Sequence, residues 1–426
     1  MEKGNLHKIL ERNLRVIKNC THECQKGMVL IATYKSSRYP HFYPRDAAAI
    51  ARALRVVVEE GHFEQACIKI LEHTSRLLMN IQGKNGHWNQ RYSIHAKDLS
   101  IYKQEDNTAH GISFLCNYLL AIESVEKKPK DGKKIFKQCM KALNAAIKDY
   151  FDNETGLFCS TTSIHEFAIE TGFTLWTNCS YLDAMEQMKK ISGKYGNAKE
   201  GKFVSEKADE LKKNITKNLF DEGRFIARLY KNKAKDMRAD ITLMSPLYFG
   251  LFDAKKCEST IEFMRKKLWD KKLGLLYRFE SEIGDSFMHN HAGIGPWIQY
   301  SAMLAQCYFK AGKKKKGEET LSHIEKFRSN NGFLPEHVAS KESFDDFWKK
   351  EWLTGMDFEK EFNKEILLDK VDFDRIANEL YFMARSYRKI RSNYKNHKRP
   401  YIRFGVPLAW SHAEFITATI LREKSN

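Results

Sequence analysis

Apolar residues recur at spacings of three and four along most of the 426-residue chain, whereas the alternation typical of half-buried strands is scarce. This pattern predicts an all-α protein. Twelve segments fit amphipathic or buried helices, over about 5–19, 45–59, 62–82, 107–126, 134–150, 174–192, 203–220, 238–251, 257–269, 294–311, 315–328 and 408–423. A further helical stretch at 340–400 is expected to be an insertion before the last of these helices.

Two kinds of helix alternate along the chain. Segments such as "DAAAIARALRVVV", "GISFLCNYLLAI" and "GPWIQYSAMLAQCYF" carry small or apolar residues almost all round, so we expect them to be buried on most sides. Segments such as "GKKIFKQCMKALNAAIKDYF" carry a lysine-rich face and suit an outer layer. This alternation of outer and inner helices indicates an internal repeat.

The junctions before the inner helices give the repeat length. Arg45 and Glu105 are 60 residues apart, Glu105 and Glu166 are 61 apart, and Asp236 and Pro296 are 60 apart. Six helical hairpins of this length, closed in a ring, predict an (α/α)6 barrel of twelve helices with an inner and an outer ring, formed by residues 1–426 as one domain.

Such a ring brings the amino-terminal ends of all inner helices to one end of the barrel. The outer-to-inner connectors hold the polar and aromatic clusters, among them "HFYPRD", "GHWNQRY", "YKQEDNTAH", "SIHEFAIETGFTLW", "GPW", "GFLPEH" and "PLAWSH". The inner-to-outer connectors hold mainly lysine and glycine. This sorting predicts a pocket at the end where the outer-to-inner connectors meet.

Two carboxylates, Glu166 and Glu336, enter this predicted pocket from the third and sixth hairpins. Glycoside hydrolysis needs such a pair, one to protonate the leaving oxygen and one to activate water or attack the sugar. A single glutamate at a helix junction is more often a solvated or capping acid. Glu170 and Glu105 are assigned to that ordinary class, with a supporting role left open.

Other residues of the same connectors suit sugar binding. Arg45 and Asp46 follow Tyr43 and Pro44 at the first turn of an inner helix, where Asp46 also favours helix initiation. Flat aromatic rings stack on the apolar faces of sugars, and their alternative role is core packing. Four of the seven tryptophans lie in or beside these connectors, namely Trp88, Trp176, Trp297 and Trp410.

Composition and charge limit the class of protein and the kinds of binding partner that the sequence allows. A chain that is 42% hydrophobic can bury a sizeable core. The formal net charge of +18 raises nucleic acid as a partner, but the lysine runs lie in separate turns without interleaved aromatics, so no nucleic-acid binding is expected. Neither a signal peptide nor a membrane-spanning segment is predicted, and nine scattered cysteines fit a reducing cytoplasm. "CTHEC" and "HNH" match no standard metal-site spacing, so no metal or other cofactor is expected.

These junctions together resemble glycoside hydrolase family 15, the inverting glucoamylases with an (α/α)6 catalytic domain. "YPRDAAAIARAL", "HWNQRY" with "QEDNTAHG", "GPW" and "GFLPEH…PLAWSHAEFI" are similar to successive motifs of that family, from about residue 38 to 420. The resemblance implies that Arg45 and Asp46 hold the terminal glucose, that Trp88 and Asp106 face the substrate, and that Trp297 opens the fifth inner helix. It also implies that Glu336 is the general base and that Glu166 is the general acid.

The sequence departs from the family at several places. The family commonly has Trp–Glu–Glu at the acid, where this chain has "IHEF" with Glu170 four residues on, so both Glu166 and Glu170 remain candidates for the acid. The long segment before "PLAWSH" is expected to favour short substrates such as isomaltose or maltose. A related trehalase and an inactive helical scaffold that only binds a partner are the alternatives, and the oligomeric state stays open.

Overall fold

The computed structural model describes residues 3–36, 39–100, 103–161, 163–165, 172–280, 295–343 and 400–425. Helices dominate these residues, as the hydrophobic pattern predicts. Their bounds are α1 (Lys3–Asn19), α2 (Pro44–Glu59), α3 (Glu64–Ile81), α4 (Asp106–Ser124), α5 (Gly132–Tyr150), α6 (Leu175–Tyr195), α7 (Ala198–Asn218), α8 (Ser245–Tyr248), α9 (Ala254–Leu268), α11 (Ile298–Lys310), α12 (Lys314–Lys326) and α16 (Ala409–Lys424).

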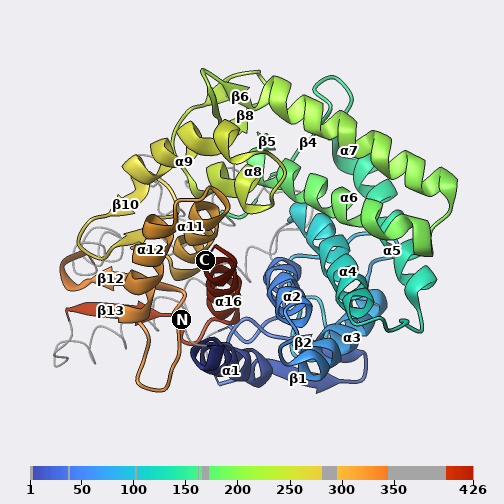
Figure 1. The fold of residues 1–426 in the computed structure, drawn as a ribbon. Coiled ribbons are helices and arrows are strands. Elements are labelled where there is room, and N and C mark those ends of the chain that lie inside the picture. Colours follow the sequence, from blue (N-terminus) through green and yellow to red (C-terminus); the bar gives the residue numbers. More distant parts are fainter. Residues whose placement is uncertain are drawn as a thin grey trace.

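The helices form two concentric rings (Figure 1). In the inner ring each helix packs on the next in the order α2, α4, α6, α8, α11 and α16, and α16 returns to α2 and closes the ring. The outer helices α1, α3, α5, α7, α9 and α12 alternate with them along the chain. The predicted (α/α)6 barrel is therefore confirmed.

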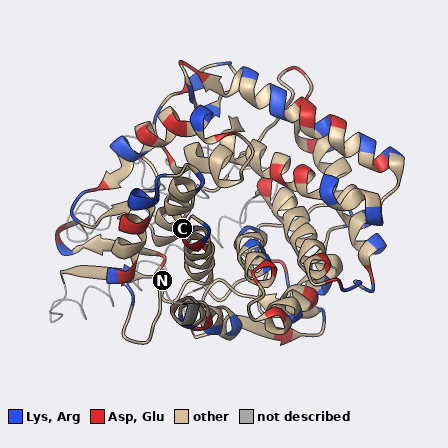
Figure 2. Cartoon of the chain, in the orientation of Figure 1, with Lys and Arg blue, Asp and Glu red and all other residues tan. Residues whose placement is uncertain are grey.

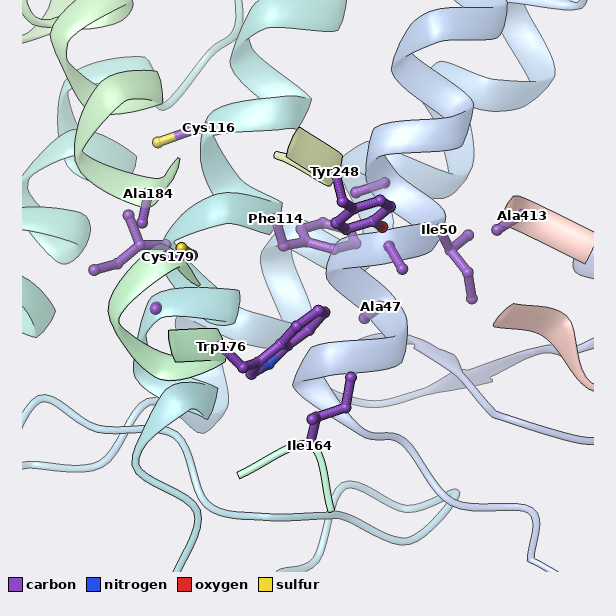
Figure 3. Packing of buried hydrophobic residues seen from close by; sticks show 14 of the residues in the cluster. Ala47, Ile50, Phe114, Cys116, Ile164, Trp176, Cys179, Ala184, Tyr248 and Ala413 are labelled. Carbon is purple, nitrogen blue, oxygen red and sulfur yellow. The ribbon is translucent and has the colours of Figure 1, made fainter. Parts of the chain in front are cut away.

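The two rings differ in burial as expected. In α4 all residues from Asp106 to Leu119 are buried, whereas the outer helices expose their charged faces (Figure 2). Side chains from several inner helices project into the barrel interior around Tyr248 (Figure 3). No described helix has the length and apolar character needed to span a membrane.

One inner helix is much shorter than the predicted range 238–251. A 3-10 turn at Ile241–Met244 leads into the single helical turn α8. Pro246 lies at the start of α8, because proline lacks the N–H that a helix interior requires. Gly250 then adopts a left-handed conformation (φ +72°), which ends the helix.

Short antiparallel hairpins, which the pattern did not predict, follow several outer helices. They pair β1 (Thr21–Cys24) with β2 (Gly27–Leu30), β3 (Phe151–Asp152) with β4 (Leu157–Phe158), β6 (Phe220–Asp221) with β7 (Arg224–Phe225), and β10 (Trp269–Asp270) with β11 (Leu275–Leu276). A separate small sheet joins β5 (Phe173–Thr174), β8 (Arg228–Leu229) and β9 (Lys235–Asp236). Each hairpin reverses the chain between an outer helix and the next connector to an inner helix.

The expected insertion at 340–400 leaves and rejoins the barrel at one place. Strand β12 (His337–Ser340) pairs antiparallel with β13 (Tyr401–Phe404), in the register that sets His337 opposite Phe404 and Ser340 opposite Tyr401. The predicted helices of the insertion lie outside the described residues. The paired strands hold both ends of the insertion beside Glu336, at the end of the barrel where the predicted pocket lies.

Candidate active site

Arg45 and Asp106, predicted from successive connectors and 61 positions apart in the chain, meet at the amino-terminal ends of α2 and α4. Nη1 of Arg45 lies 3.6 Å from Oδ2 of Asp106, and both side chains are buried. The same Oδ2 accepts a hydrogen bond from the indole Nε1 of Trp176 (3.0 Å) and lies 3.3 Å from Nε2 of His110. Three inner helices therefore converge on one buried carboxylate.

The electrostatics of this carboxylate favour its charged form. Burial alone would raise the pKa of Asp106, but the contacts with His110, Arg45 and Trp176 outweigh burial and lower that pKa. Oδ1 of Asp106 is buried and has no hydrogen-bond partner among the described residues. A buried carboxylate oxygen left without a partner indicates a place for a donor that the described residues do not supply, such as a ligand hydroxyl.

A row of aromatic rings continues from this pair towards Glu336. The Arg45 guanidinium lies 6.0 Å from the centroid of the Trp410 ring, and Tyr300 packs edge-on against Trp410 at 5.8 Å. Trp297 stacks on Tyr300 at 5.3 Å and on His337 at 4.9 Å. Predicted residues from the first, fifth and sixth hairpins thus lie in one continuous set of contacts.

Glu336 is held at its backbone and its side chain. Its N–H donates to the carbonyl of Phe404 (2.9 Å), and its own carbonyl accepts from the N–H of Ile298 (2.9 Å) at the start of α11. The hydroxyl of Tyr39 donates to Oε2 of Glu336. A carboxylate fixed in this way, beside Trp297 and half-buried, has the setting expected of the predicted general base.

The connector that leads to Glu166 is anchored against the same cluster. Glu166 and Glu170 lie outside the described residues, but the three residues before Glu166 are described. Each of the three is held by a different part of the barrel: the Ser163 carbonyl accepts from Nη1 of Arg45 (3.2 Å), the Ile164 carbonyl accepts from Nη2 of Arg278, and Nε2 of His165 lies 3.0 Å from Oδ2 of Asp240. The last described residues of the connector therefore lie against Arg45 at Ser163 and against Arg278 and Asp240 at the next two positions.

Three further predicted substrate-binding residues lie beside α4 or at the start of α2. Trp88 is buried against Gly111, and its Nε1 donates to the carbonyl of Leu78 (2.9 Å), so the structure places it in the packing between α3 and α4. Tyr43 is half-buried at the amino-terminal cap of α2, and Asp46 is buried in the first turn of that helix. Asp46 directly follows Arg45 in the chain, and Tyr43 precedes Arg45 by two positions.

Arg278 and Tyr39 are among the residues of the cluster that the sequence analysis missed. The guanidinium of Arg278 is buried, lies over the Trp297 ring at 4.9 Å and donates to the connector before Glu166. Tyr39 donates to Glu336 across 297 positions of the chain. Arg278 stands in "LLYRFE", where a cation after a run of apolar residues could have marked it, whereas Tyr39 carries no signal beyond its place before "HFYPRD".

Trp410 is also tied to a polar network inside the barrel. Its Nε1 donates to Oε1 of Glu414 (2.6 Å), and the hydroxyl of Tyr248 donates to the same oxygen (2.7 Å). Nη1 of Arg52 donates to that hydroxyl (2.6 Å), and its Nη2 lies 3.2 Å from Oδ2 of Asp183. These hydrogen bonds fix the orientation of the Trp410 ring from the barrel interior. No group of three or more potential metal-binding side chains lies together in the part of the chain that is described.

No protein-family profile matches the chain, and no curated protein sequence matches it. Solved structures do match. A substituted glycosidase in complex with glucose has a TM-score of 0.65 at 13% identity, with 99% of each chain covered. A glucoamylase from Saccharomycopsis fibuligera has a TM-score of 0.63 at 14% identity, over 99% of this chain and 96% of that chain. A bacterial glucoamylase complexed with acarbose has a TM-score of 0.62 at 13% identity, over 98% of this chain and 56% of that chain.

At these identities the likeness is one of fold. The chain has the (α/α)6-barrel fold of glucoamylase and glycosidase structures along almost its whole length, as the family resemblance of its connectors predicted.

Proposed function

We propose that the protein is an exo-acting, inverting glycoside hydrolase that releases β-glucose from the non-reducing end of short α-glucosides such as isomaltose or maltose. One observation carries the proposal. Glu336, the Arg45–Asp106 pair and the row of Trp297, Tyr300 and Trp410 converge at one end of the barrel with the connector that leads into Glu166. The neighbours of the same fold that hold glucose and acarbose support a sugar as ligand.

The proposed reaction assigns a role to each part of the cluster. Arg45, Asp46 and Asp106 bind the hydroxyls of the terminal glucose, and Oδ1 of Asp106 has its acceptor capacity unused within the described chain. The aromatic rings of Trp297 and Trp410 provide flat apolar faces for the sugar and exclude water. Tyr43 lies at the amino-terminal end of the same helix and completes the proposed binding set.

The chemical step uses two carboxyl groups. Glu166 donates its proton to the glycosidic oxygen as the bond from that oxygen to the anomeric carbon breaks. Glu336, ionised, takes a proton from a water molecule on the opposite face, and the resulting hydroxide forms the new bond to the anomeric carbon. An α-glucoside thereby yields β-glucose and a shortened alcohol, and neither metal nor organic cofactor takes part in the proposed step.

The test is glucose release from isomaltose, maltose, trehalose and soluble starch, followed by proton NMR of the anomer at early times. Initial β-glucose from a disaccharide supports the proposal, and the relative rates define the linkage. Initial α-glucose would mean that the second carboxylate acts as a nucleophile and not as a general base. Release from trehalose alone would favour a trehalase. No release from any substrate would favour an inactive binding scaffold.

Matched variants identify the acid. Glu336→Gln and Glu166→Gln should each lower turnover by about a thousandfold or more, because removal of a general acid or base removes most of the catalysis. Glu170→Gln is the matched control for Glu166→Gln, since both replace a glutamate of the same connector. A large loss in Glu170→Gln with near-normal activity in Glu166→Gln would reassign the acid to Glu170.

A further inference from the structure

The carboxylate of Glu105 makes a two-point contact with the start of the connector that leads to Glu166. Oε2 of Glu105 accepts from the backbone N–H of Thr161 (3.1 Å), and Oε1 accepts from the Thr161 hydroxyl (2.8 Å). Glu105 is only 3% exposed, although it stands at the amino-terminal end of α4. A carboxylate buried in this way is costly unless its partners are present.

Glu105 is itself held firmly from two sides. The hydroxyl of Tyr181 on α6 donates to the Glu105 carbonyl (2.7 Å). The next residue in the chain is Asp106, whose carboxylate forms the buried pair with Arg45. On the side before it, Nε2 of Gln104 donates to the Ser163 carbonyl (3.3 Å). Glu105 is therefore held in one position, and its carboxylate can define the position of Thr161 at the start of the connector.

Thr161 borders a cavity, although the residue itself is only 8% exposed. Glu105 and Thr161 both line a cavity of about 540 Å³, together with Tyr150, Phe173 and Tyr230. Loss of the carboxylate would remove both Glu105 acceptors from Thr161, at the start of a connector whose next anchor is the Ser163 carbonyl. Glu166 follows Thr161 by five residues.

We propose that Glu105 is a positioning residue of the active site: through its two hydrogen bonds to Thr161 it sets the place of the connector that delivers the general acid. This assignment rests on the proposed function. The proposed role of Glu105 concerns only the general acid. The proposed general base, Glu336, is held separately by Tyr39 and by the strand that contains Phe404.

The experiment separates the acid from the base by the choice of substrate. Isomaltose or maltose has an alkoxide leaving group that needs a proton, whereas α-glucosyl fluoride releases fluoride, a weak base that leaves without one. Glu105→Met removes both acceptors at similar volume. We expect it to lower kcat on the disaccharide by about tenfold to a hundredfold, because small displacements of a catalytic group cost that much. The rate on α-glucosyl fluoride should stay within about twofold of wild type.

Three further variants sharpen the test. Thr161→Val removes only the hydroxyl and should show a weaker loss of the same kind, and Glu105→Gln, which can still accept from the Thr161 N–H, should recover most of the activity. Thr320→Val is the matched control, since the hydroxyl of the buried Thr320 donates to the Lys316 carbonyl (2.8 Å) within the outer helix α12. It should leave both rates unchanged.

The outcomes are distinct. Equal losses of rate on both substrates would overturn the positioning role of Glu105. Full activity of both Glu105→Met and Thr161→Val on the disaccharide would overturn it as well. Neither result would contradict the proposed glycoside hydrolase activity. A wild-type protein that cleaves neither the disaccharides nor the fluoride would overturn the proposed function, and the role of Glu105 with it. If Glu105→Met fails to fold, Thr161→Val carries the same comparison.

Discussion

The guanidinium of Arg45 and the carboxylate of Asp106 form an ion pair at 3.6 Å in which neither side chain is more than 2% exposed. Such a pair lies where the barrel would otherwise bury apolar residues, and it gains little stability over an apolar pair. Its presence at the convergence of α2 and α4 is understandable if both charges serve a ligand. Replacing one residue of the pair without the other would then lower the stability of the fold.

Asp106→Asn should lower the free energy of unfolding by about 3 kcal/mol, because it removes the negative charge from a buried ion pair. Urea unfolding of wild type and variant measures the difference. Glu154→Gln is the control, since Glu154 pairs with Lys233 at 2.6 Å on the surface with both side chains 71% exposed, and this variant should unfold like wild type. An unchanged stability in Asp106→Asn would show that the buried pair contributes nothing to the fold.

Tyr39→Phe removes the hydroxyl that donates to Oε2 of Glu336. If Glu336 activates water, the loss of this donor lets its carboxylate rotate, and we expect kcat to fall by about tenfold with KM within about twofold. Initial rates of glucose release measure both. Tyr34→Phe, in the same connector but packed against Phe333, should leave both constants unchanged. A normal kcat in Tyr39→Phe would remove Tyr39 from the site.

The fold could be predicted because the apolar inner helices must be surrounded by other helices on most sides. "DAAAIARAL" offers small or apolar residues on nearly every side, and a helix of that kind is stable only inside a ring of others. The helix expected at 238–251 was wrong in length because Pro246 and Gly250 outweigh the apolar pattern around them. Two-residue strands such as β6 and β7 involve too few residues to leave a period in the sequence.

The site could be predicted only in part, for a different reason. Arg45, Asp106 and Trp410 stand at corresponding places of the repeat, so the ring brings them together whatever their side chains do. The direction of a side chain is a matter of local packing, and therefore Trp88, at an equivalent place, turned towards Leu78 instead. The contact of Tyr39 with Glu336 depends on β12 and β13, which pair across the long insertion.

Gly405→Ala tests how closely Glu336 is confined. Gly405 adopts φ +56°, and an added Cβ would lie 2.5 Å from the Tyr39 hydroxyl and 2.7 Å from Oε2 of Glu336. The side chains must move apart, so we expect kcat for glucose release to fall by about a hundredfold. Gly312→Ala is the control, because Gly312 has φ +69° with nothing within 4 Å of its added Cβ. It carries the same backbone strain of about 1–2 kcal/mol without the collision, and should keep full activity. Equal activities of the two variants would show that Glu336 is not tightly held.

The stability of the protein should depend on pH through Glu105. Burial raises the pKa of Glu105 from 4.5 to about 7, although the hydrogen bonds from Thr161 oppose the shift. Between these two values the folded protein retains the proton that the unfolded chain has lost. The stability contributed by this group is thus fully present below pH 4.5 and is lost as the pH rises to about 7.

Glu105→Gln, which stays neutral at every pH, is the reference that cancels all other titrating groups. The unfolding free energy of wild type minus that of Glu105→Gln should fall by on the order of 2–3 kcal/mol between pH 5 and pH 8. Urea unfolding of both proteins at the two pH values measures this difference. A difference that stays constant, or that grows towards pH 8, would mean that the Glu105 carboxyl is ionised in the folded protein at pH 5. The hydrogen bonds from Thr161 would then stabilise the charge more than burial opposes it.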